Sequence, residues 1–409
     1  MTVRPTSRGA DRTPLQGTRA DVLVCGASFA GLAVARELAR TGADVLVVDR
    51  YEIGARATSA CAAPTPWLHA MGVAASIRQE LPAMTFTTPH GSVRYRLPWS
   101  WSAFDYRALC SGLWAQCGDA RFETAKVDRL ARSSAEHVVR TDRGNLRAPF
   151  VVDALGWRRV LSEPHYQPPN APLSRGLEVH PAADGASGDA LDVWVERSLV
   201  RRGYAWRVPA GAEARIGVGS YDPRGHVKEP TVALARRLGE DAVRYQGNWF
   251  PHRLRSAVED GVLFVGDSAG HCFPLSGEGI RTAFYFGIAA GREIAAALAG
   301  EQSRDRALER YAGFHERHRP AFRRALALQR LVPALPPRTL TLGLRALARQ
   351  SLVDRAFSWY LDQAHPRFAA APPDRVRPDP FPSGVSGLGG RPARGAVGPP
   401  RGGQVPGAQ

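Results

Sequence analysis

Residues 21–50 read DVLVCGASFAGLAVARELARTGADVLVVDR, and this stretch decides the fold. Residues 21–26 and 43–50 are short apolar runs typical of buried strands, whereas residues 28–42 have the apolar spacing of a helix closed by Gly42. A strand, a helix and a second strand within about 30 residues predict one βαβ unit. Because such a unit makes its two strands parallel, we expect a layered α/β domain.

The turn between this strand and helix reads GASFAG (residues 26–31), in the place of a G-x-G-x-x-G nucleotide motif. Gly26 allows the tight turn, Gly31 allows close packing of helix on strand, and the first helical turn offers N–H groups to a pyrophosphate. Ser28 replaces the middle glycine, and its hydroxyl is able to donate to a phosphate oxygen. Asp49 ends the second strand 18 residues after Gly31, where its carboxylate can accept from ribose hydroxyls. The predicted contacts are Gly26, Ser28, Phe29, Ala30, Gly31, Asp49 and Arg50.

A second motif lies far along the chain, where residues 261–291 read GVLFVGDSAGHCFPLSGEGIRTAFYFGIAAG. A strand ending in Gly-Asp, a Pro/Gly loop and a helix in this order resemble the second FAD signature of the glutathione-reductase-like flavoproteins. By that resemblance Asp267 holds the ribityl hydroxyls, and Gly277 and Gly279 place N–H groups near flavin N1–C2=O. A helix dipole there stabilises the negative charge of reduced flavin. The residues implied are Gly266, Asp267, Pro274, Gly277, Gly279 and Ile280.

The order of five motifs along residues 20–360 resembles the geranylgeranyl reductase family, within the p-hydroxybenzoate-hydroxylase-like flavoproteins. The motifs are GASFAG, TSACAAPTPWLHAMG, VVDALGWRR, GYAWRVPAGAEARIGVG and GDSAGHCFPLSGEGI. The resemblance implies an α/β fold with a Rossmann-like FAD-binding domain, an interleaved antiparallel sheet that covers the substrate, and C-terminal helices. It also implies non-covalent FAD and hydride delivery from flavin N5 to C=C bonds of a hydrophobic isoprenoid substrate. NAD(P)H or a ferredoxin would be the electron donor.

The same resemblance suggests residues close to the reaction. Cys61 stands in a place similar to the family's cysteine, although Ala62 follows where the family favours glycine; a small buried hydrophobe is the alternative. Arg107 resembles the family's flavin-contacting arginine, or is a surface arginine. The alternating strand GYAWRVP gives Tyr204 and Trp206 one sheet face, which covers the flavin's substrate side or belongs to the sheet core.

Other reactions stay open at this point. Residues 153–156 read DALG and not the D-G-x-x-S of aromatic hydroxylases, which weakens a hydroxylase but leaves a monooxygenase or dehydrogenase of small natural products as the alternative. Residues 204–209 also resemble the W-x-W-x-I-P of flavin-dependent halogenases. Those enzymes need a lysine early in the chain, and the two lysines here are Lys126 and Lys228. A flavin-binding protein without turnover is the third hypothesis.

Composition divides the chain. Residues 1–20 are polar and unpatterned, and residues 371–409 are so rich in Pro and Gly that we expect both ends to be disordered. Between them we predict an FAD-binding domain at 21–315, with a substrate domain inserted at about 80–100 and 165–250. A C-terminal helical part follows at 316–370.

The charge of the chain is strongly positive, +16, and nearly all its basic residues are arginine. No zinc-finger or RNP pattern is present, so we expect no nucleic-acid partner. Arginines interleaved with leucines over residues 315–355 indicate either a helix packed on the core or one lying on an anionic membrane. Five scattered cysteines without a C-x-x-C pair, no secretory signal and no 18-residue apolar run predict a cytoplasmic protein without structural metal, peripheral to the membrane at most.

Overall fold

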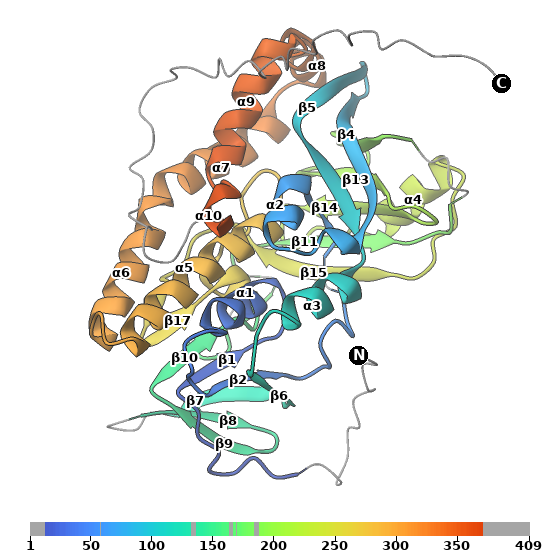
Figure 1. Cartoon of the computed structure of the whole chain (residues 1–409). Helices are drawn as coiled ribbons and strands as arrows, with labels where there is room; N and C mark the ends of the chain where they lie inside the picture. The colour runs from blue at the N-terminus through green and yellow to red at the C-terminus, as the bar shows by residue number, and fades with distance from the viewer. Residues whose placement is uncertain are drawn as a thin grey trace, which may run out of the picture.

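The computed structural model describes residues 13–57, 59–131, 136–162, 167–168, 170–183 and 188–370 (Figure 1). The predicted C-terminal disordered segment 371–409 lies outside these ranges, as do residues 1–12. Two large sheets divide the described chain. The first holds the N-terminal βαβ unit, and the second stands above it beside the C-terminal helices.

The first sheet has six strands in the order β16-β17-β10-β1-β2-β6. Its strands pair in parallel, apart from the antiparallel pair of β16 with β17. The βαβ unit lies at its centre, as the apolar runs predict. The strands are β1 Val22–Cys25, β2 Val45–Asp49, β6 Arg121–Thr124, β10 Phe150–Asp153, β16 Val258–Glu259 and β17 Val262–Phe264.

Both faces of this sheet are covered, which explains why its central strands are apolar throughout. Val22 and Val24 pack toward helices α1 (Phe29–Leu38) and α5 (Ile280–Leu298). Leu23 and Cys25 point the other way, into a second cluster. There a three-stranded sheet closes the face, made of β7 Val127–Ala131, β8 His137–Thr141 and β9 Gly144–Ala148.

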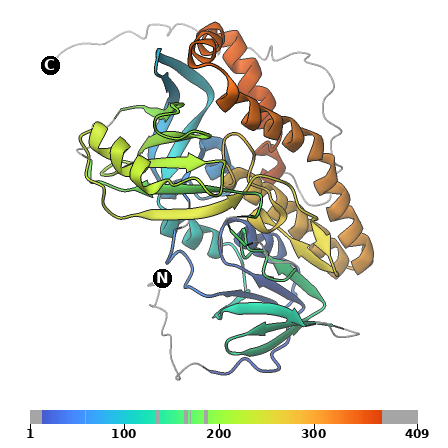
Figure 2. The ribbon, with the colours of Figure 1, turned by 180° about the vertical axis from the view of Figure 1, so that it is seen from behind.

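The second sheet has eight strands in the order β15-β11-β14-β13-β12-β4-β5-β3. Neighbours are antiparallel apart from the parallel pair β12 and β4. Helix α4 (Lys228–Arg237) packs on one face, as Figure 2 shows from behind. The strands are β3 Ala62–Pro64, β4 Ile77–Thr88, β5 Gly91–Phe104, β11 Leu173–Val179, β12 Ala190–Trp194, β13 Gly203–Pro209, β14 Ala214–Ser220 and β15 Gln246–Pro251. The sheet therefore begins earlier in the chain than the predicted segment of about 80–100.

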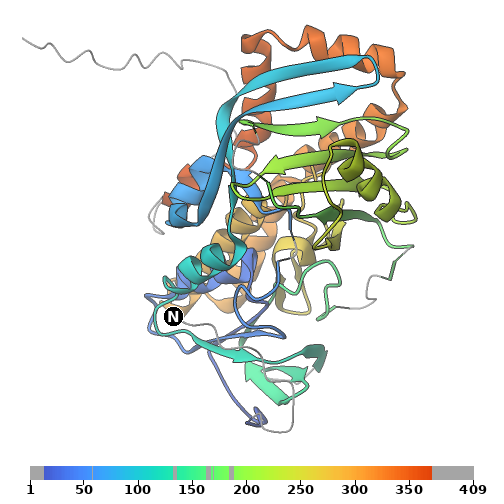
Figure 3. The same ribbon diagram turned by 90° about the vertical axis from the view of Figure 1, so that its right-hand side faces the viewer.

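Helices α8 (Pro337–Ala346) and α9 (Gln350–Asp362) lie along the other side of the eight-stranded sheet (Figure 3), whereas α6 (Arg304–Arg317) packs on α5. Two hydrogen bonds fasten α8 to the sheet, from Tyr95 Oη to the Leu344 carbonyl at 2.7 Å and between the hydroxyls of Thr88 and Thr341 at 2.6 Å. The helices are α6 Arg304–Arg317, α7 Arg319–Leu331, α8 Pro337–Ala346, α9 Gln350–Asp362 and α10 Arg367–Ala370. Earlier in the chain lie α2 Thr65–Ala70 and α3 Tyr106–Trp114. Within the described ranges, no helix combines the length and apolarity needed to cross a membrane.

The expectation of a disordered N-terminus through residue 20 is wrong for residues 13–20. Leu15 and Ala20 are buried against the three-stranded sheet. The Leu15 N–H donates to the Arg143 carbonyl at 2.7 Å, and the Gly17 N–H donates to the Asn145 carbonyl at 2.9 Å. One buried leucine and an edge strand are enough to order this segment, and neither produces a periodic pattern in the sequence.

Candidate functional site

A cavity of about 1730 Å³ runs from the carboxyl end of β1 to the C-terminal helices. Residues of both glycine motifs line one part of it. The eight-stranded sheet and helices α7–α9 line the other part. One continuous space therefore joins a nucleotide-type turn to an apolar chamber.

The β1–α1 turn has the geometry that its glycines predict. Gly26 has φ +113°, and a Cβ there would lie 2.3 Å from the Ala154 carbonyl oxygen. A Cβ on Gly31 would lie 1.9 Å from the Gly26 carbonyl oxygen. These two glycines thus shape the backbone of the turn without lining the cavity, whereas residues 27–30 between them line it.

The start of α1 fits an anionic ligand. Ser28, its N-cap, makes no side-chain hydrogen bond to the first turn, so that turn's N–H groups remain for a ligand. The Ser28 hydroxyl instead accepts a 3.0 Å hydrogen bond from Tyr106 Oη. Tyr106 lines the cavity, and burial raises the pKa of its phenol well above the usual range. The sequence analysis missed this tyrosine, whose only signal was its place at the start of α3.

Arg107, for which the resemblance implies a flavin contact, follows Tyr106 in α3. Its side chain is exposed and does not line the cavity. Its backbone packs on the turn at Gly54, where an added Cβ would lie 2.9 Å from Arg107 Cα. Because α3 turns Tyr106 toward the turn of β1, the next side chain lies on another face of the helix, and the flavin contact of Arg107 stays a prediction.

Asp49 lies at the cavity wall with both carboxylate oxygens engaged by backbone. Its Oδ2 accepts from the Ala27 N–H at 2.9 Å, and its Oδ1 accepts from the Tyr51 N–H at 3.0 Å. Burial raises the pKa of Asp49 above its usual value. Each oxygen keeps a second lone pair, which is the acceptor that a ribose hydroxyl needs.

The second glycine motif lies beside the first, since a Cβ on Gly266 would lie 3.0 Å from Ala30 Cβ. Asp267 lies in a 3₁₀ turn after β17, lines the cavity, and has its pKa raised to about 7 by burial. Gly277, with φ +66°, and Gly279 lead into α5 and line the same wall, together with Gly266 and Ile280. Pro274 is buried behind this loop and does not reach the cavity.

Side chains from the rest of the molecule hold this loop. Tyr204 Oη donates to the Ser276 carbonyl, and Tyr221 Oη donates to the Leu275 carbonyl. The Leu275 N–H donates to Gln329 Oε1 of α7 at 2.8 Å. Leu275 itself has φ +72°, a conformation that leucine rarely adopts. These three hydrogen bonds hold Leu275 in that backbone conformation. One of them occupies the hydroxyl of Tyr204.

Cys61 lies behind the cavity wall. It is buried, it does not line the cavity, and its thiol donates to the Ser59 carbonyl at 3.1 Å. Burial raises the pKa of this thiol well above its usual value, which keeps it protonated. Its φ is +52°, and the neighbouring residues Ser59, Ala60 and Ala62 form the wall in front of it.

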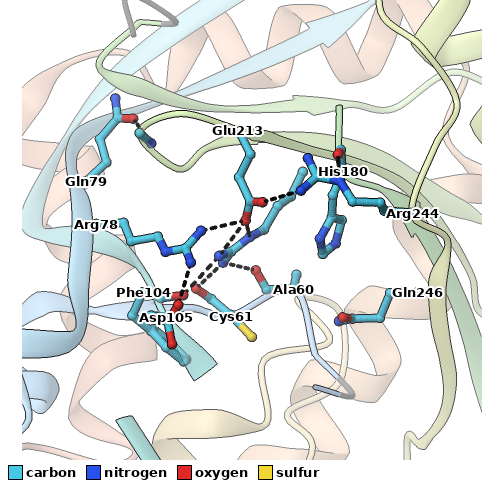
Figure 4. Close-up of polar contacts among 12 residues, drawn as sticks. Ala60, Cys61, Arg78, Gln79, Phe104, Asp105, His180, Glu213, Arg244 and Gln246 are labelled. Carbon is cyan, nitrogen blue, oxygen red and sulfur yellow. Dashed lines mark hydrogen bonds and ion pairs between the residues drawn. The ribbon is translucent and has the colours of Figure 1, made fainter. Parts of the chain in front are cut away.

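Arg215 holds the segment that contains Cys61 in place. Figure 4 labels its partners Ala60, Cys61, Phe104 and Glu213. Its guanidinium donates to the Ala60 carbonyl at 2.9 Å, the Cys61 carbonyl at 2.8 Å and the Phe104 carbonyl at 3.0 Å. Glu213 pairs with it at 3.1 Å. Sequence analysis missed Arg215, because its partners are backbone groups of a segment about 150 residues away.

The apolar part of the cavity has two walls. The sheet supplies Trp206 and Val208 from β13, with further side chains from β4 and β12, namely Met84, Phe86, Leu191 and Val193. The C-terminal helices supply the facing wall, with Leu328, Val332, Leu340, Leu344, Phe357 and Tyr360. No group of three His, Cys, Asp or Glu side chains in the described ranges is arranged to hold a metal ion.

Comparison with known proteins agrees with this arrangement. A family described as FAD-dependent oxidoreductase matches residues 21–72. Digeranylgeranylglycerophospholipid reductase 2 of Methanopyrus kandleri is 25% identical over 368 residues, covering 81% of this chain and 91% of that protein.

Two solved structures share the fold. A geranylgeranyl bacteriochlorophyll reductase-like protein of Thermoplasma acidophilum matches with a TM-score of 0.74 and 17% identity, covering 86% of this chain and 98% of the other. PqsL of Pseudomonas aeruginosa, described as a probable FAD-dependent monooxygenase, matches with a TM-score of 0.62 and 18% identity, covering 83% of this chain and all of that one.

The predicted Rossmann-like flavoprotein fold is confirmed by these neighbours and by the two sheets. The matched segment 21–72 contains the first glycine motif and the acid of β2. The sequence similarity to the Methanopyrus kandleri reductase extends over most of the chain. The chain is an FAD-dependent oxidoreductase, and its relatives include the geranylgeranyl reductases.

Proposed function

We propose that this oxidoreductase reduces C=C bonds of an isoprenoid chain. The observation that carries the proposal is the single cavity that connects both glycine motifs to an apolar chamber. Bound FAD supplies a hydride from its reduced N5 in such chemistry. The names of the relatives, which include a reductase of digeranylgeranylglycerophospholipid, support a hydrophobic prenyl substrate.

The chain's own residues would hold FAD without a covalent bond. The N–H groups at the start of α1 and the Ser28 hydroxyl suit the pyrophosphate, and Asp49 suits the ribose. Asp267 suits the ribityl hydroxyls, and the backbone of residues 277–279 suits the pyrimidine edge of the flavin. Gly26 and Gly31 act by shaping the turn.

The three predicted catalytic residues take different parts in this proposal. Trp206 forms the floor of the substrate chamber. Tyr204 positions the flavin loop through the Ser276 carbonyl, to which its hydroxyl donates. Cys61 acts through the position of residues 59–61, because its thiol lies behind the wall.

The chamber walls of leucine, valine and phenylalanine exclude water from the reacting bond. An unactivated alkene has no polar group that the protein could bind. Its position therefore depends on the shape of the chamber and on burial of apolar surface. Electrons would come from NAD(P)H or from a ferredoxin. Stopped-flow reduction with each donor distinguishes these two sources.

The proposal includes contact with an anionic membrane through α7 and α8. Exposed leucines at 328, 331, 342 and 347 lie on or next to these helices, and two of them, Leu328 and Leu347, also line the cavity. The same helices carry exposed arginines, namely Arg330, Arg338 and Arg345. Such a basic, apolar rim would let a lipid-borne chain pass from the bilayer into the chamber.

Vesicle sedimentation tests this contact. We expect binding to vesicles rich in phosphatidylglycerol and weak binding to pure phosphatidylcholine. Replacing Leu331 and Leu342 by glutamine should reduce binding to the anionic vesicles by about tenfold, because both side chains are exposed in the free protein. Equal binding of the double variant and the wild type would refute the contact.

The decisive experiment for the reaction is turnover with prenylated substrates, once without and once with oxygen, followed by mass analysis. A reductase adds two hydrogen atoms per reduced bond, whereas a monooxygenase supplied with oxygen adds one oxygen atom. The structural similarity to a probable monooxygenase makes the second outcome the alternative. Flavin that is reduced while every substrate stays unchanged would indicate a binding protein without turnover.

A further inference from the structure

One row of residues crosses the cavity face of the eight-stranded sheet. Strand register places them opposite one another on β15, β11, β14, β13, β12 and β4. In that order the row reads Gln246, Glu178, Gly217, Trp206, Val193 and Phe86. All except the glycine line the cavity, and polarity falls from the first residue to the last.

The indole of Trp206 lies over three glycines. A Cβ on Gly217 would lie 2.3 Å from Trp206 Cζ2, 2.5 Å from Cε2 and 2.8 Å from Glu178 Cβ. A Cβ on Gly219 would lie 3.2 Å from Cζ3, and one on Gly176 would lie 3.5 Å from Cη2. Gly176, Gly217 and Gly219 thus form a trough in the sheet, which we call the glycine trough.

The trough is confined to one face of the sheet. Ile216 and Val218 alternate with the two glycines of β14, and both are buried in the cluster beneath α4. On that face, β14 therefore carries large apolar side chains, which pack beneath α4. On the cavity face, glycine leaves a space that the indole fills.

Glu178 anchors the indole in the trough. Its Oε2 accepts from Trp206 Nε1 at 3.1 Å, while Oε1 accepts from Gln246 Nε2 at 3.1 Å and from His180 Nε2 at 2.9 Å. Glu178 is buried, with 3% of the residue exposed. Turning the indole out of the trough would remove one donor from this buried carboxylate, which is unfavourable.

We propose that the glycine trough determines the width of the substrate chamber and thereby selects methyl-branched chains over linear ones. Carbon atoms pack at about 3.5–4.0 Å, so a Cβ at 2.3 Å from Cζ2 would force the indole upward by roughly an ångström or more. The chamber above Trp206 would lose the room that a methyl branch occupies. The expected preference for a branched substrate rests on the proposed function. The effect of the glycine trough on the width of the chamber follows from the distances alone.

Ligand binding tests the proposal without turnover. Hexahydrofarnesol and dodecanol have the same main-chain length, differ in methyl branches, and contain no C=C bond to reduce. Titration into the FAD-loaded protein, followed by calorimetry, gives both affinities. We expect Gly217→Ala to weaken hexahydrofarnesol binding by about tenfold and dodecanol binding by less than about threefold.

A second substitution checks that the effect runs through the indole. Trp206→Phe removes the indole atoms that lie over Gly217, so Gly217→Ala combined with Trp206→Phe should recover the part of the affinity that is lost through the indole. The contact of the new Cβ with Glu178 Cβ, at 2.8 Å, is the same in both variants. Gly313→Ala in α6 is the control, because its Cβ would have Arg317 Nη1 as nearest neighbour, at 3.9 Å. It should leave both affinities unchanged.

Two results would overturn the proposal: equal losses for both alcohols, or a loss that the double variant does not recover. If Gly217→Ala fails to fold, Trp206→Phe alone decides, since an emptied trough should raise the affinity for a wider, cyclohexyl-capped alcohol. An unchanged affinity would refute the width role. Failure of alkene reduction, by contrast, would leave these binding results standing and would count against the proposed function alone.

Discussion

Arg215 shows how a single buried residue controls the cavity wall. Its side chain is 4% exposed and satisfies three backbone carbonyls, two of them in the segment with Cys61. Cys61 has a left-handed backbone, which costs a non-glycine residue roughly 1 kcal/mol or more. The arginine therefore keeps residues 59–61 in a conformation that they would otherwise leave.

We predict that Arg215→Met lowers the free energy of unfolding by about 3 kcal/mol, because it leaves buried carbonyls without donors. It should also expose the Cys61 thiol, which mass spectrometry would detect as faster alkylation of that cysteine in the native protein. Arg244→Met is the matched control. Arg244 contacts the same Glu213 but is 56% exposed, so its loss should cost less than about 1 kcal/mol. Unchanged alkylation in Arg215→Met would contradict the assignment.

At the nucleotide turn, Gly26→Val should abolish FAD binding. The valine would need φ near +113° and would place its Cβ against the Ala154 carbonyl. Asp267→Ala should also lower FAD affinity, by roughly a hundredfold, through lost hydrogen bonds to the ligand. Flavin absorbance of the purified variants measures both effects, with Gly313→Ala as control. If the purified Gly26→Val variant retained one FAD per chain, the proposed FAD site would be refuted.

Among the elements, the loop between η2 (Gly266–Ala269) and α5 is held in place by side chains from other parts of the fold. Tyr204 and Tyr221 reach it from the eight-stranded sheet, and Gln329 reaches it from α7. Tyr360 of α9 donates to Glu278 Oε2 at 3.0 Å, and Glu278 pairs with Arg281 at 2.8 Å. The proposed flavin edge is thus built by elements that lie outside the nucleotide-binding sheet.

Tyr221→Phe should release this loop in part. Loss of one buried hydrogen bond costs about 1 kcal/mol, which corresponds to about a fivefold faster dissociation of FAD. Release of bound FAD into an excess of an FAD-binding apoprotein, followed by flavin fluorescence, measures the rate. Tyr245→Phe is the control, since Tyr245 is 48% exposed. Equal rates for both variants would show that the loop keeps its form without Tyr221.

At the scale of the whole molecule, three buried histidines join the six-stranded sheet to the C-terminal helices. The Gly266 N–H donates to His271 Nδ1, so His271 carries its proton on Nε2 and donates it to His315 Nδ1 at 3.0 Å. Burial lowers the pKa of His271 well below its usual value, and that of His315 and His318 to about 4. The three rings are therefore neutral in the folded protein near pH 7.

This predicts a loss of stability in acid. The unfolded chain binds a proton at each histidine near pH 6.5, whereas folded His315 does so near pH 4. Stability is therefore complete above about pH 6.5 and falls as the pH decreases toward 4. His315 alone should account for about 2 kcal/mol of the loss between pH 7 and pH 5.

Comparing His315→Gln with the wild type isolates this contribution, because Asp267, with a pKa of about 7, titrates in both proteins. Urea unfolding at several pH values should show a shallower acid dependence in the variant. The exposed His69→Gln should keep the slope of the wild type. Parallel curves for all three proteins would contradict the prediction.

Sequence by itself determined the features that depend on neighbours along the chain. The βαβ unit, the two glycine motifs and the acid of β2 follow from local periodicity and turn chemistry, and the fold neighbours confirm the class of fold. The glycine positions were predictable because glycine adopts a positive φ without a steric penalty and because no other residue tolerates such close backbone contact.

Only the tertiary structure decided which side chains face the cavity. It turned Arg107 outward and Tyr106 inward, placed Cys61 behind the wall, and brought Arg215 to carbonyls about 150 residues away. It also set Trp206 over glycines of two other strands. These outcomes depend on strand register and helix rotation, and a shift of one residue reverses the facing of every side chain in a strand. Long-range packing alone fixes that register, so no local pattern in the chain carries it.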